Sequence, residues 1–115
     1  MLGATTAPQQ NGDSWIYQTV TIPSTVTAAS LNFYYWGVCG DTVANDWQEV
    51  QIQNTSGTTL AQVMKTCTTS TGWTKVYFNL INYKGQTIRV LLNAHGNGDN
   101  NLTYMYVDDV TVSVR

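Results

Sequence analysis

Charged residues are scarce in this sequence. Lys, Arg, Asp and Glu make up 10% of the 115 residues, against about 25% in an average globular domain. Five basic and seven acidic residues leave a net charge of −2, so the chain lacks the basic patch that nucleic acid requires. No apolar run approaches the roughly 18 residues of a membrane-spanning helix. The sequence therefore favours neither a nucleic-acid-binding protein nor a membrane protein.

The residues that build common catalytic sites are scarce as well. His95 is the single histidine, which excludes a His-rich zinc site and leaves any catalytic triad dependent on one residue. The chain holds no phosphate-binding loop or dinucleotide fingerprint. Asp108 and Asp109 are neighbours on a predicted strand and point to opposite faces, so they cannot flank one glycosidic bond. We therefore predict that this chain is not an enzyme.

Helical periodicity is almost absent, whereas alternation of apolar and polar residues recurs along the whole chain. Pro, Gly and Asn residues separate the alternating segments, as they do between strands. The predicted strands span residues 16–22, 31–36, 47–52, 60–64, 74–80, 87–94 and 104–114. This spacing predicts an all-β fold, an antiparallel β-sandwich.

The length and the composition indicate one domain. A chain of this size buries about two-thirds of its unfolded surface, and its 43% of hydrophobic residues can fill the core. We predict a single sandwich domain over residues 14–115. Residues 1–13 are rich in Thr, Pro, Gln, Asn and Gly, so we expect part of this segment to be a tail and part to pack on the sandwich.

Thr, Asn, Gln and Ser supply most of the polar residues, which is typical of extracellular β domains. Cys39 and Cys67 match no metal-binding or redox spacing, so a disulfide in an oxidising compartment is the prediction, with two buried free thiols as the alternative. Residues 1–6 lack the basic and apolar regions of a signal peptide. Secretion, which we expect, would need a signal upstream of Met1.

One set of strand positions carries aromatic and amide side chains where Thr, Lys and Ser are usual. The opposite positions are aliphatic or aromatic and form the predicted core, so this set faces outward. Aromatic rings cover the apolar faces of sugars, and amide and charged groups pair with sugar hydroxyls. The predicted ligand-binding residues are Tyr34, Trp36, Trp47, Glu49, Gln51, Tyr77, Arg89 and Asn93, with Asn79 beside them. The alternative is that Trp36 and Trp47 pack under loops or against the second sheet. Trp15 and Trp73 lie near strand ends, and we expect both to be structural.

Asp108 shares its position in the strand alternation with Val110, Val112 and Val114, which predicts that it points inward. A buried carboxylate without a partner is costly. Ca²⁺, which binds six to eight oxygen atoms, would remove that cost, and the segment around Asp13 could supply further ligands. The alternative is a β-bulge that turns both Asp108 and Asp109 to solvent.

The order of several short segments resembles a known family. These segments are Leu2-Gly3, Gln18–Pro23, Leu31–Trp36, Asp46–Ile52, Gly72-Trp73, Tyr83–Val90 and Tyr106–Val110. Together they resemble the MAM-like, galactose-binding-like jelly-roll modules appended to secreted bacterial peptidases and glycoside hydrolases.

The resemblance implies a jelly roll, a non-catalytic role beside a parent catalytic domain, and a structural calcium at Asp108 or Asp109 with ligands near Asp13. Two functions follow as hypotheses. The first is a carbohydrate-binding module that binds a polysaccharide or oligosaccharide for a secreted enzyme. The alternative is a structural or protein-interaction domain appended to a secreted peptidase.

Overall fold

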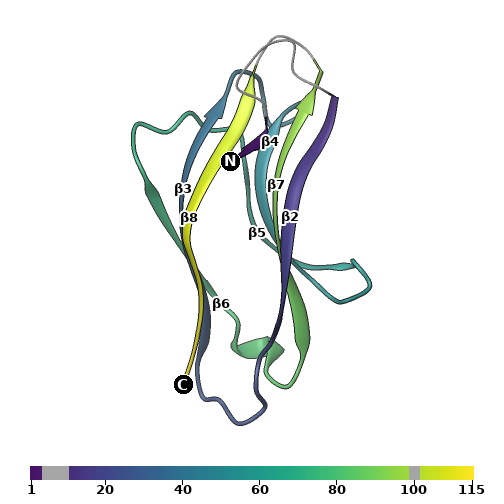
Figure 1. The fold of residues 1–115 in the computed structure, drawn as a ribbon, viewed down its shortest axis with the longest axis vertical. Helices are drawn as coiled ribbons and strands as arrows, with labels where there is room; N and C mark the ends of the chain where they lie inside the picture. Colours follow the sequence, from purple (N-terminus) through teal and green to yellow (C-terminus); the bar gives the residue numbers. More distant parts are fainter. Residues whose placement is uncertain (4–10, 99–101) are drawn as a thin grey trace.

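Two four-stranded antiparallel sheets face each other in a sandwich (Figure 1). The structure, a computed structural model, describes residues 1–3, 11–98 and 102–115. The first sheet, here the β3 sheet, has the order β1 (Leu2–Gly3), β8 (Thr103–Val114), β3 (Ala29–Cys39) and β6 (Thr74–Asn79). The second, the β7 sheet, has the order β2 (Asn11–Thr21), β7 (Thr87–Asn97), β4 (Trp47–Gln53) and β5 (Thr59–Thr66). The predicted all-β sandwich is confirmed.

The chain changes sheet between most consecutive strands. From β2 onward, only β4 and β5 are consecutive in the sequence and adjacent in one sheet. A short 3-10 helix, η1 (Ile81–Tyr83), lies between β6 and β7. In the described part of the chain no helix is long and apolar enough to cross a membrane. This alternation between two facing sheets is a jelly-roll type of topology.

The core follows the predicted alternation. On β3, the side chains of Leu31, Phe33 and Tyr35 are buried, and Val50 and Ile52 of β4 meet them from the opposite sheet. Alternation along a strand sends successive side chains to opposite faces, so the intervening residues of both strands lie outside. The inward-facing residues of β7, from Ile88 to Ala94, are buried in the same way.

One polar side chain, Gln48, is fully buried between the sheets. Its amide donates hydrogen bonds to the carbonyls of Thr68 (3.0 Å) and Tyr104 (3.2 Å), and its oxygen accepts one from the Thr68 N–H (3.1 Å). A Cβ atom on Gly37 would lie 2.3 Å from the Gln48 Nε2 atom. The glycine is therefore needed so that this amide can cross between the sheets.

The disulfide between Cys39 and Cys67 is present, with 5.2 Å between the Cα atoms, and this prediction is confirmed. Cys39 ends β3, and Cys67 directly follows β5. The bond therefore links the two sheets at one end of the sandwich.

Several strands are longer than the sequence patterns predict, and β2 and β7 are among them. β2 begins at Asn11 rather than near Ile16, and β7 continues to Asn97 beyond the predicted end at Ala94. The added residues pair with each other, so Asp13 lies opposite His95 in the register. The strands thus extend through polar and Gly-containing segments that usually signal loops.

The expected N-terminal segment, residues 1–13, is described only in part. Leu2 and Gly3 pair with Met105 and Tyr104 of β8, and the last residues of the segment begin β2. Residues 4–10, where the expected tail falls, lie outside the described residues.

The expectation that Asp108 points inward is wrong, because β8 contains a β-bulge. Asn32 pairs with Thr111 and Tyr34 pairs with Asp108, so β8 holds one extra residue at this place. Asp109 has a positive φ of 53°, and both carboxyl groups are exposed. An extra residue reverses the alternation along a strand, which is why the inward position of Val112 does not extend to Asp108.

Candidate functional site

The outer face of the β7 sheet is built from four rungs of side chains that run across three strands. Each rung takes one residue from β2, one from β7 and one from β4, which the sheet register places side by side. Cross-strand neighbours in one rung lie close enough to contact each other. In order, the rungs are Asp13–His95–Trp47, Trp15–Asn93–Glu49, Tyr17–Leu91–Gln51 and Thr19–Arg89–Gln53.

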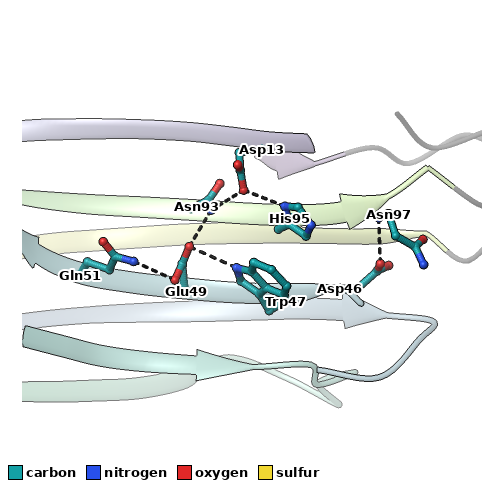
Figure 2. A network of polar contacts seen from close by, with 8 residues as sticks. All are labelled: Asp13, Asp46, Trp47, Glu49, Gln51, Asn93, His95 and Asn97. Carbon is teal, nitrogen blue, oxygen red and sulfur yellow. Dashed lines mark hydrogen bonds and ion pairs between the residues drawn. The ribbon is translucent and has the colours of Figure 1, made fainter. Parts of the chain in front are cut away.

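Glu49 is the centre of a hydrogen-bond network on this face (Figure 2). Its side chain is only 7% exposed and accepts four hydrogen bonds. The donors are Trp47 Nε1 (3.1 Å), Asn93 Nδ2 (2.7 Å), Gln51 Nε2 (3.0 Å) and Gln62 Nε2 (3.4 Å). Since both carboxylate oxygens already have two donors each, Glu49 orients its neighbours and has no free acceptor position for a ligand.

The amide of Asn93 bridges two carboxylates. Its Nδ2 atom donates to Glu49 Oε1 and to Asp13 Oδ1 (2.9 Å), and Asp13 Oδ1 also lies 2.9 Å from His95 Nδ1. The carboxylates accept both amide hydrogens, so the orientation of the amide is fixed. The Asn93 Oδ1 atom consequently points away from them and is buried without a hydrogen-bond partner.

Trp47 presents little of its ring for stacking. The imidazole of His95 stacks on it with 3.9 Å between ring centroids, and the Lys65 ammonium lies 4.0 Å from the indole centroid. His95 belongs to β7 and Lys65 to β5, which flank β4 on opposite sides. The two faces of the indole are therefore covered, and the bond to Glu49 holds the ring in this position.

Two other aromatic side chains of the face are open to solvent. Trp15 is 56% exposed and Tyr17 is 40% exposed, and their rings stack at 5.7 Å and 15°. The Arg89 guanidinium lies over the Tyr17 ring, with its Cζ atom 4.4 Å from the ring centroid. Because aromatic rings of this exposure offer apolar surface without being part of the core, they are suited to contact a ligand.

These side chains line a groove of about 430 Å³. The β4–β5 hairpin projects on the side away from the β3 sheet (Figure 1), and Gly57 in its turn borders the groove. The lining residues are Asp13, Trp15, Tyr17, Trp47, Glu49, Gln51, Gln53, Gly57, Arg89, Leu91 and Asn93.

The eight predicted ligand-binding residues do not form one surface. Trp47, Glu49, Gln51, Arg89 and Asn93 line the groove of the β7 sheet. Tyr34, Trp36 and Tyr77 lie on β3 and β6, so they belong to the outer face of the β3 sheet on the other side of the sandwich. The prediction of a single face is wrong, because alternation separates inside from outside but does not say which sheet a strand joins.

Sequence reasoning missed five residues of the groove: the exposed aromatic residues Trp15 and Tyr17, and also Gln53, Gly57 and Leu91. Trp15 was expected to be structural, yet it is one of the more exposed aromatic residues. The alternation along the sequence already puts Asp13, Trp15 and Tyr17 on one face of the strand, and Ile16, Gln18 and Val20 on the other. A predicted strand that begins at Ile16 leaves Asp13 and Trp15 out, so this pattern is not recognised.

The predicted calcium ligands do not come together. Asp13 lies in the β7 sheet and already contacts Asn93 and His95, whereas Asp108 and Asp109 lie at the bulge of the β3 sheet. Among the described residues no group of three His, Cys, Asp or Glu side chains could hold a metal ion. Calcium binding by this chain stays a prediction, without the buried carboxylate that motivated it.

A fully buried carboxylate does occur at Asp46, just before β4. Its Oδ1 atom accepts a hydrogen bond from the Asn97 N–H (3.0 Å), and its Oδ2 atom accepts one from the Thr103 hydroxyl. These contacts tie the residue before β4 to the end of β7 (Figure 2) and to the start of β8.

Known structures share this fold. A carbohydrate-binding module, TmCBM61, solved in complex with β-1,4-galactotriose, matches with a TM-score of 0.61 and 14% identity, over 92% of this chain and 67% of that chain. The enzymatically active domain of tailspike protein 4 from bacteriophage CBA120 matches with a TM-score of 0.58 and 8% identity, over 98% of this chain and 15% of the tailspike chain. No family model and no curated protein matches the sequence. At these identities the likeness establishes the jelly-roll type of β-sandwich alone.

Proposed function

We propose that this chain is a non-catalytic carbohydrate-binding module that binds an oligosaccharide in the groove of the β7 sheet. The observation that carries the proposal is the Asn93 side chain, 96% buried on the groove floor with its Oδ1 atom unpaired, as its 4% exposure and missing partner indicate. A buried acceptor without a donor is costly. A sugar hydroxyl supplies such a donor, and the exposed Trp15 and Tyr17 rings supply an apolar surface for the sugar ring.

Access to the Asn93 oxygen depends on a neighbouring side chain. The atom is shielded from solvent, and Trp15 lies directly opposite Asn93 in the register. Since Trp15 is exposed, we expect it to be the side chain that turns aside when a sugar enters. Binding should therefore change the emission of this tryptophan.

A non-catalytic role agrees with the state of the two carboxylates in the groove. Glycoside hydrolysis needs one carboxyl group as an acid and a second as a nucleophile or base. Glu49 accepts hydrogen bonds from Trp47, Asn93 and Gln51, and the Oδ1 atom of Asp13 is engaged by Asn93 and His95. TmCBM61, which has a similar fold, was solved with a galactotriose, and this likeness supports the proposal that the present chain binds an oligosaccharide.

The proposal includes secretion and a parent catalytic domain. A disulfide that links the sheets fits an oxidising compartment, which supports secretion, and a module of this kind would serve a parent catalytic domain elsewhere in a longer chain. A structural or protein-interaction role is the second candidate. The exposed aromatic residues Tyr34, Trp36 and Tyr77 on the β3 sheet, with Trp73 just before β6, favour it, because a partner domain could cover them.

Titration of tryptophan emission with a panel of oligosaccharides, β-1,4-galactotriose included, tests the proposal. We expect a saturable change in wild type that is lost in Trp15→Ala and kept in Trp36→Ala. The absence of binding across the panel would reject the module, and loss of binding in Trp36→Ala alone would move the ligand to the β3 sheet. Release of reducing ends from a bound glycan would contradict the non-catalytic role.

A further inference from the structure

Arg89 lines the groove without an ion-pair partner among the described residues. It lies in the last of the four rungs, between Thr19 of β2 and Gln53 of β4, which are both neutral. Among the described residues, the one ion pair joins His95 to Asp13, so Arg89 has no carboxylate partner there. The guanidinium makes a cation–π contact with the Tyr17 ring.

The guanidinium also lacks a hydrogen bond that its position calls for. The Nε atom of Arg89 is buried and has no partner. Arginine presents its donors as a rigid fork that matches the two oxygens of a carboxylate. An unpaired buried donor on a half-buried cation marks a position where an anionic group of a ligand would be stabilised.

The acidic groups of the groove lie at its other end. Asp13 and Glu49 belong to the first and second rungs, whereas Arg89 belongs to the fourth. Gln53 is the cross-strand neighbour of Arg89. Along β4, Glu49 lies four residues from Gln53, which corresponds to about 13 Å. Glu49 accepts four hydrogen bonds from the protein itself, and Asp13 accepts from Asn93 and His95 through its Oδ1 atom. A negative group at Arg89 therefore meets one cation and no nearby free acid.

We infer that the Arg89 end of the groove binds the carboxylate of an acidic sugar, so that the preferred ligand is a uronic-acid-containing glycan. This inference rests on the proposed function, because it assigns the chemistry of one end of the same groove. Trp15, Tyr17 and Asn93 contact sugar in any glycan, and Arg89 distinguishes the acidic from the neutral one. The two oxygens of a carboxylate match the edge formed by Nε and one terminal nitrogen, once the Arg89 side chain moves enough to uncover the shielded Nε atom. A sulfate ester can make the same paired contact, so a sulfated glycan is a separate arm of the test.

The experiment compares uronate oligosaccharides with their carboxyl-reduced counterparts, which differ only in the acidic group. Oligosaccharides of polygalacturonate, polyglucuronate and alginate serve as probes, with a sulfated glycan as a further arm. We expect wild type to bind at least one acidic form about tenfold or more tightly than its reduced form, as a charge-assisted bidentate contact implies. The preference should shrink as salt is raised, because the charges are partly exposed.

Variants separate this inference from the proposed function. In Arg89→Gln the preference for the acidic over the reduced form should be lost, whereas Arg89→Lys should keep part of it. Lys75→Gln removes the same charge from the β3 sheet and is the matched control, with the preference intact.

Three results would overturn the inference. Equal affinity for acidic and reduced forms, with both lost in Trp15→Ala, rejects the uronate and leaves the carbohydrate-binding module in place. Tighter binding of the sulfated glycan than of any uronate rejects the carboxylate as the recognised group. Absence of binding to every probe, acidic or neutral, rejects the proposed function and this inference with it.

Discussion

The outer faces of the two sheets both expose aromatic rings, but they differ in what surrounds those rings. On the β7 sheet, Trp15 and Tyr17 stand beside a continuous network that runs from Asp13 through Asn93 to Glu49. On the β3 sheet the rings contact each other edge-on, Trp36 with Trp73 at 5.9 Å and Tyr104 with Tyr106 at 5.8 Å. Exposed aromatic residues alone therefore do not identify a binding face.

What distinguishes the β7 face is that its polar groups are held in place before a ligand arrives. Glu49 fixes the Trp47 indole, the Gln51 amide and the Asn93 amide at once. Side chains that are already ordered lose less conformational entropy on binding. The β3 face offers apolar surface without that arrangement, which suits contact with a protein better than recognition of hydroxyl groups. Each prediction below tests this difference.

The largest expected effect concerns the disulfide between Cys39 and Cys67, which links the two sheets. Replacing Cys39 and Cys67 together by Ser should lower the free energy of unfolding by about 3–4 kcal/mol, since the disulfide closes a long loop. Urea denaturation measures this loss. Because the bond lies outside the groove, glycan affinity at a temperature where the variant is folded should change little. A large loss of affinity in the folded variant would show that the groove depends on the link between sheets.

Glu49→Ala should destabilise the β7 face by about 2–3 kcal/mol, because it leaves the donors of Trp47, Asn93 and Gln51 without their acceptor. Glu49→Gln should cost less, since the amide keeps one accepting oxygen. Lys75→Ala removes an exposed charged side chain from the β3 face and is the control, with an expected change within about 0.5 kcal/mol. Equal effects of the two alanine variants in urea denaturation would remove Glu49 from the centre of the network.

Trp15→Ala should weaken glycan binding by about 2 kcal/mol, roughly thirtyfold in Kd, as expected for a central aromatic contact. The melting temperature should stay near that of wild type, because the side chain is more than half exposed. Trp36→Ala is the matched substitution on the β3 sheet and should leave the affinity unchanged. Calorimetric titration of both variants compares the two faces directly, and the reverse result would exchange their roles.

Much of the fold could be predicted from the sequence, because burial imposes a period of two on a strand. Leu31, Phe33, Val50 and Ile52 are buried as that pattern predicts. Membership of a sheet could not be predicted in this way. Tyr34 and Gln51 have the same outward position on their strands, yet they lie on opposite sides of the molecule, because sheet partners are chosen by long-range contacts that local alternation does not encode.

The candidate site was harder to predict for two local reasons. Trp15 falls at the polar beginning of a strand whose first residues pair only because β7 also extends. Asp108 precedes a bulge, where a single extra residue reverses the alternation. In both places the deciding interaction is a cross-strand pairing, so the sequence of one strand alone could not reveal it.

The bulge gives a small but specific prediction. Asp109 adopts a positive φ, a conformation that costs least for Gly. Asp109→Gly should therefore change stability by less than about 1 kcal/mol in either direction, and Asp109→Val should destabilise by about 1–2 kcal/mol, because a β-branched residue disfavours this backbone. Thermal denaturation of the two variants measures the difference. A Val variant as stable as the Gly variant would mean that this residue does not hold a left-handed conformation.

The smallest expected effect concerns calcium at the same place. A cation that binds only the folded state raises the melting temperature by mass action, so comparison of chelator with excess Ca²⁺ reveals any bound ion. Whatever the response of wild type, we expect the same response in Asp108→Asn, because Asp108 and Asp109 are exposed on the β3 sheet and Asp13 lies on the other sheet. A response lost in Asp108→Asn would instead place a cation at the bulge. The β3 face would then hold a ligand as well, and the contrast between the two faces would no longer stand.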